Sequence, residues 1–543
     1  MRRMSIALAL LLWLTIGGSL SLAQTASPAA TPAVDLSGTM PLPLSGNRLA
    51  EFETYVQDLM KTLGVPGASI AVVQGDQVVL LKGYGVRDLR SNSPVTPDTL
   101  MMIGSITKSF TSMMAASEVD AGWLSWDTPI VDLLPYFAVS DPSLTPKLTV
   151  ADAFCACTGL PRHDPELIFN FDSITPKSMV ESVANYPLTA PLGAEFQYSN
   201  QMYAIGGYAA AEAAGANPAD PYPGYVALMQ DRLLNPMGMT RSTFSLDEAL
   251  ASGDYAQEYG TNLDGSVSPI SLVSDDGFTK TVASAGALWS NASDMAAYLQ
   301  TQMADGVAPN GTQVVSAENL AKTHEGRVKT QPNPGLPPFV NESAQAYGMG
   351  WVVGSYKGQP MLSHNGGTLA FTSNLAYLPD ADLGIVILTS GTQGAEVLIN
   401  ALPFRLLELL FDQPDEIDPL LQQLLSGGQG GPSIGTLDAS AVAPYLGTYT
   451  NDALGDVTLR MQGDKLIFDA GEVRSGLVPV MDESGKAMGY IFSDSPLFGA
   501  QALVSLAQGD NGKPELVTEV MGEGAAKYVF TQVKGGAMAT PSP

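Results

Sequence analysis

Hydrophobic positions recur with two different periods along this chain. An amphipathic helix is predicted after residue 47, where apolar residues follow helical spacing: Leu49, Phe52, Val56, Leu59, Met60 and Leu63. An apolar run from Ser69, a Gly-containing turn at Gly75 and a second run from Val78 predict a β-hairpin. Helical patterns alternating with loops fill residues 105 to about 320. Strand patterns return in four segments, before a helix from Glu396 to Leu410: Met349–Gly354, Gln359–Ser363, Phe371–Leu378 and Gly384–Thr389.

This order of elements predicts an α/β (α+β) unit over residues 48–411. We expect an antiparallel sheet made from both ends of the unit, flanked by helices, with a helical region inserted between its halves. The junction between sheet and helices falls at Ser105. Clefts commonly lie at such junctions.

A change of composition marks a second domain after residue 411. Residues 412–440 are rich in Pro, Gly and Gln, which predicts a linker. Short alternating runs separated by Asp/Gly turns then predict a small all-β antiparallel barrel over residues 441–535. These runs start at Gly447, Val457, Lys465, Gly489, Ala502 and Lys527. The tail, residues 536–543, is expected to be disordered.

The N-terminus has the pattern of a secretory signal. Arg2 and Arg3 precede an apolar run from Ile6 to Ile16, and small residues at Ser21 and Ala23 suit cleavage near Ala23. We therefore expect a secreted or periplasmic protein without a stable membrane anchor after cleavage. The alternative, an uncleaved anchor, is disfavoured because the apolar run is short. Residues 24–47, rich in Ala, Thr and Pro, predict a flexible spacer.

Composition narrows the possible functions. The 543 residues are 45% hydrophobic and 15% charged, as expected for two or three folded domains. The net charge is −28 and the basic residues do not cluster, so we expect no nucleic-acid partner. The acidity itself favours solubility. The oligomeric state does not follow from the sequence.

Neither cysteines nor histidines predict a metal site. Cys155 and Cys157, the only cysteines, are badly placed to bridge each other within a regular element, so we expect buried thiols on a helix beneath the active site. The three histidines have no metal-ligand spacing, and His163 is interpreted as a structural loop anchor. No cofactor or metal is expected.

The most informative motif is Ser105-Ile106-Thr107-Lys108. Helical spacing begins directly after Gly104, so Ser105 opens a helix and Lys108 lies one turn later on the same face. A serine hydroxyl needs an adjacent base to act as a nucleophile, and a lysine in a dry pocket can be that base. Taken alone, the motif favours a helix-capping serine and a solvated lysine, so the catalytic interpretation depends on partners elsewhere in the sequence.

Two further segments supply matching chemistry. Tyr198 and Asn200 form a Tyr-x-Asn motif before an Ala-rich helix. A tyrosine there can carry a proton to a leaving group if a nearby ammonium stabilises its phenolate, and Asn200 can bind a substrate amide. His364 is followed by Asn365, Gly366 and Gly367 on a predicted strand. The N–H groups of Ser105 and Gly367 are expected to form an oxyanion hole.

The three motifs in this order resemble the serine β-lactamase and penicillin-binding-protein superfamily, in particular its class C-like branch of esterases, D-amino-acid peptidases and carboxypeptidases. The resemblance covers residues 48–411. It extends over five further stretches, at Thr158–Asp164, Asn235–Phe244, Ala283–Ser290, Tyr347–Trp351 and Leu375–Leu388. His364 departs from the lysine typical of penicillin-hydrolysing members, which favours a peptidase or esterase. Tyr445–Tyr449 resembles the start of the lipocalin-like domains that follow this unit in some peptidases.

The resemblance implies a hydrolase that forms an acyl-enzyme from a small-molecule, short-peptide or ester substrate. Its catalytic residues would be Ser105, Lys108, Tyr198 and His364, with either Lys108 or Tyr198 as the general base. Residues expected to contact substrate are Asn200, Asn365 and Gly366. Three alternatives stay open: a β-lactamase, a penicillin-binding sensor that does not turn over, and a protein whose barrel is the functional part.

Overall fold

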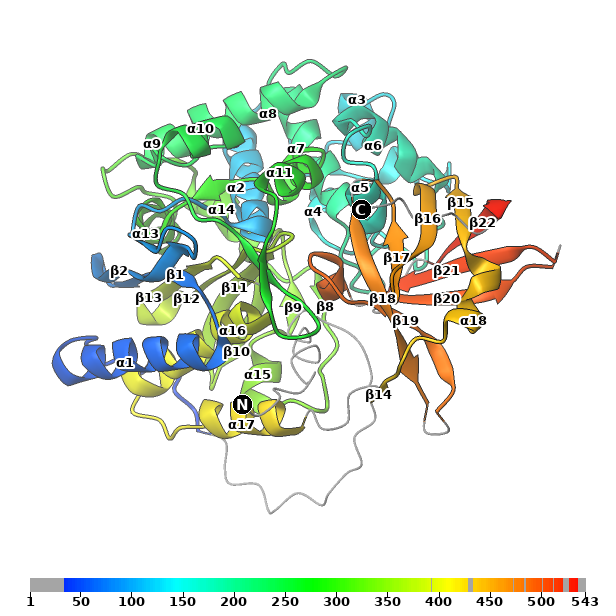
Figure 1. Ribbon diagram of the computed structural model, residues 1–543. Helices are drawn as coiled ribbons and strands as arrows, with labels where there is room; N and C mark the ends of the chain where they lie inside the picture. Colours follow the sequence, from blue (N-terminus) through cyan, green and yellow to red (C-terminus); the bar gives the residue numbers. More distant parts are fainter. Residues whose placement is uncertain are drawn as a thin grey trace.

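The computed structural model describes residues 34–391, 393–427, 433–471, 473–482, 485–500, 502–510, 512–520 and 527–535. These residues form a large unit of helices around a sheet and, beside it, a C-terminal barrel (Figure 1). The expected signal segment 1–23, the first part of the spacer and the tail 536–543 lie outside the described residues. None of the helices in the described ranges has the length and apolar character needed to cross a bilayer.

The central sheet of the large unit is antiparallel and combines segments from both of its ends. Its hydrogen-bonded order is β3-β2-β1-β13-β12-β11-β10-β9-β8. The strands are β1 (Gly67–Gln74), β2 (Gln77–Asp88), β3 (Ser93–Pro94), β8 (Val328–Lys329), β9 (Ala346–Tyr347), β10 (Val352–Tyr356), β11 (Gln359–Gly367), β12 (Thr372–Leu378) and β13 (Leu383–Thr389). The predicted α+β sheet with an inserted helical region is confirmed.

Both faces of this sheet are covered by helices. Along β1, Ile70 and Val72 belong to the hydrophobic core on one face, while Ala71 and Val73 belong to the core on the other. This explains why β1 and β13 are buried at nearly every position and read as continuous apolar runs. The first face is covered by α1 (Gly46–Leu63), α16 (Gln393–Leu410) and α17 (Ile417–Gly427).

The second face is covered by the helical region between the two halves of the sheet, with α2 (Thr107–Asp120) at its centre. Nearly every residue of α2 is buried. Around it lie α3 (Ile130–Leu133), α4 (Val150–Phe154), α5 (Asp164–Phe169), α6 (Pro176–Ser182), α7 (Asn200–Ala213), α8 (Pro221–Met229), α9 (Asn235–Met237), α10 (Leu246–Ala251), α11 (Leu272–Lys280), α12 (Ala283–Gly286), α13 (Ala292–Met303) and α14 (Ala317–His324). The short α15 (Pro338–Glu342) packs near β10.

Two segments expected to be linkers are packed against the large unit. The expected linker 412–440 contains α17, because Ile417 and Leu421 follow helical spacing and are buried against the core around α16. Part of the expected spacer is also fixed, since the Gln359 side chain donates to the carbonyl oxygens of Leu36 and Thr39. The prediction missed the short apolar patterns in both segments because it relied on their overall composition, which is typical of linkers.

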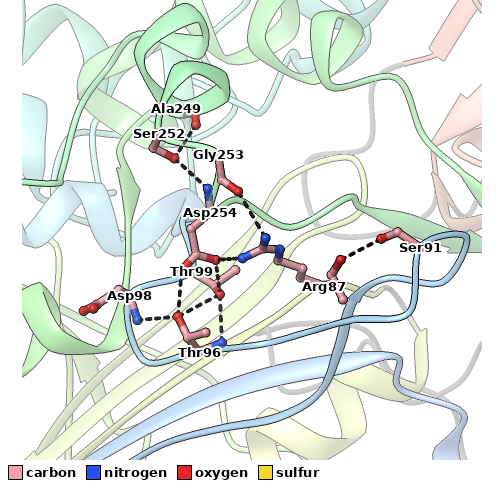
Figure 2. Close-up of polar contacts among 10 residues, drawn as sticks. Arg87, Ser91, Thr96, Asp98, Thr99, Ala249, Ser252, Gly253 and Asp254 are labelled. Atoms are coloured by element: carbon pink, nitrogen blue, oxygen red, sulfur yellow. Dashed lines mark hydrogen bonds and ion pairs between the residues drawn. The ribbon is translucent and has the colours of Figure 1, made fainter.

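A hydrogen-bond network braces the segment that leads to Ser105 (Figure 2). The carboxylate of Asp254, just after α10, pairs with the guanidinium of Arg87 on β2. It also accepts hydrogen bonds from Thr96 Oγ1 at 2.8 Å and Thr99 Oγ1 at 2.7 Å. Directly beyond, β4 (Met101–Met102) pairs with β7 (Trp289–Ser290). The segment that precedes Ser105 is therefore held first by the Asp254 network and then by the pairing of β4 with β7.

The C-terminal domain is a closed antiparallel barrel of eight strands, which confirms the predicted antiparallel barrel. Its strands are β15 (Gly447–Asn451), β16 (Gly455–Gln462), β17 (Lys465–Asp469), β18 (Arg474–Met481), β19 (Ala487–Phe492), β20 (Ala502–Gln508), β21 (Pro514–Val520) and β22 (Lys527–Gly535). Pairing of β18 with β19 closes the ring, and β14 (Ser433–Ile434) adds to β18. Alternate residues such as Val457, Leu459 and Phe468 fill the interior.

Candidate active site

Ser105 lies where the start of α2 meets the end of β11. A short 3-10 turn, Gly104–Ile106, precedes α2, and Gly104 has a left-handed φ of 52°. A Cβ on Gly104 would lie 2.5 Å from Gly367 N and 2.8 Å from Gly367 O, so only glycine permits this approach. The backbone of Gly367 is therefore held beside the Ser105 turn. Ser105 itself is partly exposed, so a substrate can reach its hydroxyl.

Lys108 is fully buried and its amine has three neighbours. Its Nζ lies 3.0 Å from Ser105 Oγ, 2.7 Å from Asn200 Oδ1 and 2.8 Å from the Ala285 carbonyl oxygen. Both oxygens from Asn200 and Ala285 can only accept. A neutral amine donates its two N–H groups to them and keeps its lone pair for Ser105. This arrangement suits a base.

The orientation of the Asn200 amide is set by Asp164. Nδ2 of Asn200 donates to both carboxylate oxygens of Asp164, at 3.0 Å each. Its Oδ1 must therefore face Lys108. Burial, followed by the positive charge of Arg162, lowers the pKa of Lys108 well below its usual value, and the Asp164 charge opposes this only in part. The buried amine is thus held toward its neutral form.

Tyr198 lies between Lys108 and Arg162, just before α7. Lys108 Nζ lies 4.7 Å from the centre of its ring, and Arg162 Cζ lies 5.4 Å from it. Burial raises the pKa of Tyr198, and hydrogen bonding with Ser105 and the charge of Arg162 lower it only in part. Tyr198 is therefore held as a neutral phenol in contact with Ser105, rather than as the phenolate that the sequence analysis considered.

His364 is buried beneath the site, with both ring nitrogens occupied. Nδ1 lies 2.6 Å from the Asn365 carbonyl oxygen, which can only accept, so Nδ1 carries the proton. Nε2 then accepts from the Tyr347 hydroxyl at 3.0 Å. Burial, followed by the positive charge of Lys108, lowers the pKa of His364 to about 3. The imidazole is neutral and supports Tyr347 rather than facing Ser105.

This burial predicts an acid sensitivity that a single substitution should reduce. The folded protein binds the His364 proton more weakly than the unfolded chain, so stability is lost as pH falls from about 6.5 toward 3, by up to about 1.4 kcal/mol per pH unit. Between about pH 7 and pH 4.5, His364→Gln should therefore lose roughly 2 kcal/mol less unfolding free energy than the wild type in urea titrations. Equal losses in both proteins would contradict this.

The other expected substrate contacts divide between the two faces of β11. Asn365 points to the α16 face, where its side chain donates to Asn400 at 2.8 Å and accepts from Asn374 at 2.6 Å. Strand alternation places it opposite His364, so its assignment to substrate binding was wrong. A Cβ on Gly366 would lie 1.9 Å from the Ile103 carbonyl oxygen, so Gly366 permits close packing. Gly367 faces open space.

Cys155 and Cys157 form a disulfide, contrary to the free thiols predicted. They lie beyond the end of α4, and Ala156 between them takes a left-handed φ of 51°, which brings their Cα atoms within 5.2 Å. The prediction assumed a regular element, where this geometry does not occur. The turn is joined to the Tyr198 segment: Gln197 N–H donates to the Ala156 carbonyl and Gly193 N–H to the Cys157 carbonyl, both at 2.7 Å.

Removing this disulfide should loosen the segment that carries Tyr198. For Cys155→Ser with Cys157→Ser, we expect a loss of about 1–2 kcal/mol in unfolding free energy from loop closure alone. We also expect Ser105 to react several-fold more slowly with a fluorophosphonate, a reagent that modifies reactive serines. Urea unfolding and the rate of adduct formation measure the two effects. Adding Ala156→Gly should restore part of the stability, because glycine adopts the left-handed conformation without strain. A double variant with wild-type stability and rate would contradict the expectation.

Several residues of the site were not identified from the sequence. Asp164 and Arg162 come from a stretch that carried the family resemblance but no assigned role. The Tyr203 hydroxyl donates to the Lys108 carbonyl at 2.7 Å, and Tyr347 supports His364. Among the described residues, no group of three or more His, Cys, Asp or Glu could hold a metal. A charged Arg–x–Asp pair in a loop was the one signal that pointed to this cluster.

A buried carboxyl pair holds the loop that follows Gly367. Asp275 and Glu258 are fully buried, and Asp275 Oδ1 accepts the Leu369 N–H at 3.0 Å. Burial raises the pKa of Asp275 to about 6 and that of Glu258 well above its usual value, with the Asp275 charge adding to the latter. With its pKa raised in this way, Glu258 is held protonated at neutral pH, which removes charge repulsion between the two carboxyls. The pair thereby keeps the Gly367 loop against the site.

A serine and a buried lysine at the start of a central helix, beside a sheet drawn from both ends of the unit, define the serine β-lactamase and penicillin-binding-protein class. The chain belongs to the Beta-lactamase family, whose sequence model matches residues 52–409, more than half of the chain. Comparison with a solved structure supports the fold. The octameric penicillin-binding protein homologue from Pyrococcus abyssi superposes with a TM-score of 0.57 at 20% identity, over 89% of this chain and 100% of that one.

Relatives with similar sequences are named as hydrolases and penicillin-binding proteins. An unguisins hydrolase from Aspergillus campestris is 29% identical over 67% of this chain and 66% of its own length. An unguisins hydrolase from Aspergillus violaceofuscus is 26% identical, over 67% and 65%. Penicillin-binding protein 4 from Amycolatopsis lactamdurans is 28% identical over 60% of this chain and 81% of its own. The chain thus spans just under two thirds of the length of the two hydrolases.

Proposed function

We propose that this protein is a serine hydrolase that cleaves amide or ester bonds through an acyl-enzyme on Ser105. The observation that carries the proposal is the environment of Lys108. Two acceptor-only oxygens, from Asn200 and Ala285, use both N–H groups of a neutral amine and leave its lone pair for the Ser105 hydroxyl, 3.0 Å away. A purely structural lysine would not need its amine beside the hydroxyl of a partly exposed serine.

In the proposed reaction, Ser105 Oγ attacks the substrate carbonyl carbon and its proton passes to Lys108 Nζ. The N–H groups of Ser105 and Gly367 stabilise the oxyanion. Tyr198 gives its proton to the leaving amine or alcohol and is reprotonated from the Lys108 ammonium. Water then attacks the ester carbonyl, its proton passes to the same network, and Ser105 Oγ leaves as the hydroxyl.

This division of roles follows from opposite pKa shifts. The pKa of Lys108 is lowered and that of Tyr198 is raised, so at neutral pH the amine is available without its extra proton to act as the base, while the phenol keeps the proton that it can donate. His364 acts through Tyr347 and is assigned a positioning role. Asn200, which binds both Lys108 and Asp164, is assigned the same role in place of substrate binding.

The proposed substrates are D-amino-acid peptides or amides, or short esters. The neutral His364 places no charge on β11 for a substrate carboxylate. The names of the relatives, unguisins hydrolase and penicillin-binding protein, support an acyl-transfer reaction of this kind. A β-lactamase, or a penicillin-binding sensor that keeps its adduct, is the second candidate and is favoured by the penicillin-binding relative.

Intact-mass spectrometry tests the proposal. The protein is incubated with a fluorophosphonate and, separately, with a penicillin, and then assayed on D-amino-acid amides and short-chain esters. We expect one adduct on Ser105 with the fluorophosphonate, together with turnover of at least one amide or ester. A stable penicillin adduct without turnover of any substrate would favour the sensor. No adduct with either reagent would overturn the proposal.

We also propose that the protein is exported. A disulfide in a chain with only two cysteines fits an oxidising compartment. N-terminal sequencing of the protein recovered outside the cytoplasm should find a chain that begins near Gln24. Recovery of the full-length chain from the cytoplasm alone would contradict export.

A further inference from the structure

Helix α5 contacts both the candidate active site and the C-terminal barrel. Its first residue, Asp164, accepts both hydrogen bonds from Asn200, whose Oδ1 binds the amine of Lys108. Its last residues, Ile168 and Phe169, pack against the hydrophobic core of the barrel. Figure 1 shows α5 beside the barrel strands β16 and β17. Six residues therefore connect the candidate catalytic base to a separate domain.

The barrel contacts α5 through both apolar and polar groups. The ring of Phe169 meets that of Phe468 on β17 edge to face, with 6.1 Å between centroids. Directly after the helix, Asn170 Nδ2 donates to the Ala453 carbonyl of the barrel at 2.9 Å and to the Glu166 carbonyl at 2.9 Å. The C-terminal end of α5 is thus fixed to the barrel by packing and by hydrogen bonds.

The other end of α5 is held by Tyr528, which reaches from β22 into the large unit. Its hydroxyl lies 3.4 Å from His163 Nδ1, which in turn lies 3.1 Å from Glu166 Oε1. The His163 ring stacks on Tyr186 with 3.7 Å between centroids, and the Tyr186 hydroxyl donates to Glu166. Tyr528, His163, Glu166 and Tyr186 are all buried. His163 directly precedes Asp164, so this cluster holds the residue next to Asp164.

We propose that the barrel positions the catalytic base: Tyr528 and Phe169 orient α5, so that Asp164 holds Asn200 against Lys108. The inference rests on the proposed function of Ser105 and Lys108, and it gives the barrel a role that neither the fold nor the relatives assign. Tyr528 and Phe169 are positioning residues, since they act through Asp164 and touch neither Ser105 nor Lys108.

The test uses the full-length chain with Tyr528→Phe and Phe169→Ala. The matched control is Ser495→Ala, which removes a different barrel contact, the 2.8 Å hydrogen bond from Ser495 Oγ to the Thr261 carbonyl. The rate of fluorophosphonate acylation is measured against pH. We expect about tenfold slower acylation in the two test variants, because a shift of about 1 Å at a catalytic group has effects of this order or larger. Ser495→Ala should behave as the wild type.

The pH profile separates positioning from general destabilisation. The carboxylate of Asp164 raises the pKa of Lys108, so a displaced Asp164 should shift the rising limb of the acylation profile to lower pH. Loss of stability alone would lower the rate without moving the limb. Unchanged rate and limb in both test variants would overturn the inference, as would an equal loss of rate in Ser495→Ala.

Hydrogen–deuterium exchange makes the result independent of activity. We expect faster exchange of the segment around Asn200 in Tyr528→Phe and Phe169→Ala, and unchanged exchange in Ser495→Ala. If the wild type itself is not acylated, the proposed function fails, while the exchange data still decide whether the barrel orders this segment. Equal exchange in all four proteins would overturn the positioning role. Tyr528→Phe keeps the ring and hence the packing, so the test does not depend on Phe169→Ala folding.

Discussion

Replacing Ser105 with Ala is expected to abolish both adduct formation and turnover. The variant lacks the only hydroxyl within reach of the Lys108 lone pair in the described site, and loss of the nucleophile in comparable hydrolases lowers kcat by roughly 10⁶-fold. The fold should be unaffected, because Ser105 is partly exposed and its side chain contacts Lys108 and Tyr198 within the site. Intact mass with a fluorophosphonate and hydrolysis of the best amide or ester measure the effect.

The matched control for this variant is Ser117→Ala. Ser117 lies on the same helix, α2, and its hydroxyl donates to the Met114 carbonyl at 2.7 Å, away from the site. It should retain wild-type labelling and turnover. If Ser105→Ala still hydrolysed substrate at the wild-type rate, another nucleophile would be at work and the acyl-enzyme mechanism would be wrong.

The second large effect is expected from Lys108→Met, which keeps the length of the side chain and removes the amine. Acylation of Ser105 should fall by about 10²- to 10⁴-fold, the usual contribution of a general base. The rise of the acylation rate with pH should also disappear, because that rise reflects deprotonation of Lys108. Unfolding free energy should fall as well. The Asn200 and Ala285 oxygens lose their donor, at about 1–3 kcal/mol each, and relief from burying an amine offsets part of this.

Two further variants distinguish the role of Lys108 as a base from the effect of its positive charge. Lys108→Arg keeps a positive charge but cannot accept a proton, so it should be as inactive as Lys108→Met. Lys82→Met removes an exposed lysine that pairs with Glu53 and should leave the rate unchanged. Acylation of Lys108→Met within a few-fold of the wild type, with the pH dependence retained, would move the role of base to Tyr198 or to another group.

Local patterns were enough to predict most elements of the fold. The strands and helices that repeat with a clear period, such as β12, β13 and α16, lie within a few residues of their predicted bounds. Two barrel strands, β18 and β21, and the helix α17 were missed. In α17 the apolar residues Ile417 and Leu421 lie next to Gly- and Gln-rich sequence, so composition outweighed a short period.

The errors at the site have two distinct physical causes. Asn365 was misassigned although strand alternation was available from the sequence, because His364 and Asn365 were taken as one motif rather than as neighbours on opposite faces. The disulfide required a left-handed Ala156, which the sequence does not indicate, since alanine rarely adopts that conformation.

By itself, the sequence determined the serine–lysine pair and the order of the elements, because both depend on the spacing of nearby residues. Only the tertiary structure decided how the pair is used. Lys108 meets Asn200 and Ala285 from 92 and 177 positions away, and Tyr528 reaches His163 across 365. Contacts at such separations depend on how the sheet, the inserted helices and the barrel pack together, and no local period encodes that packing.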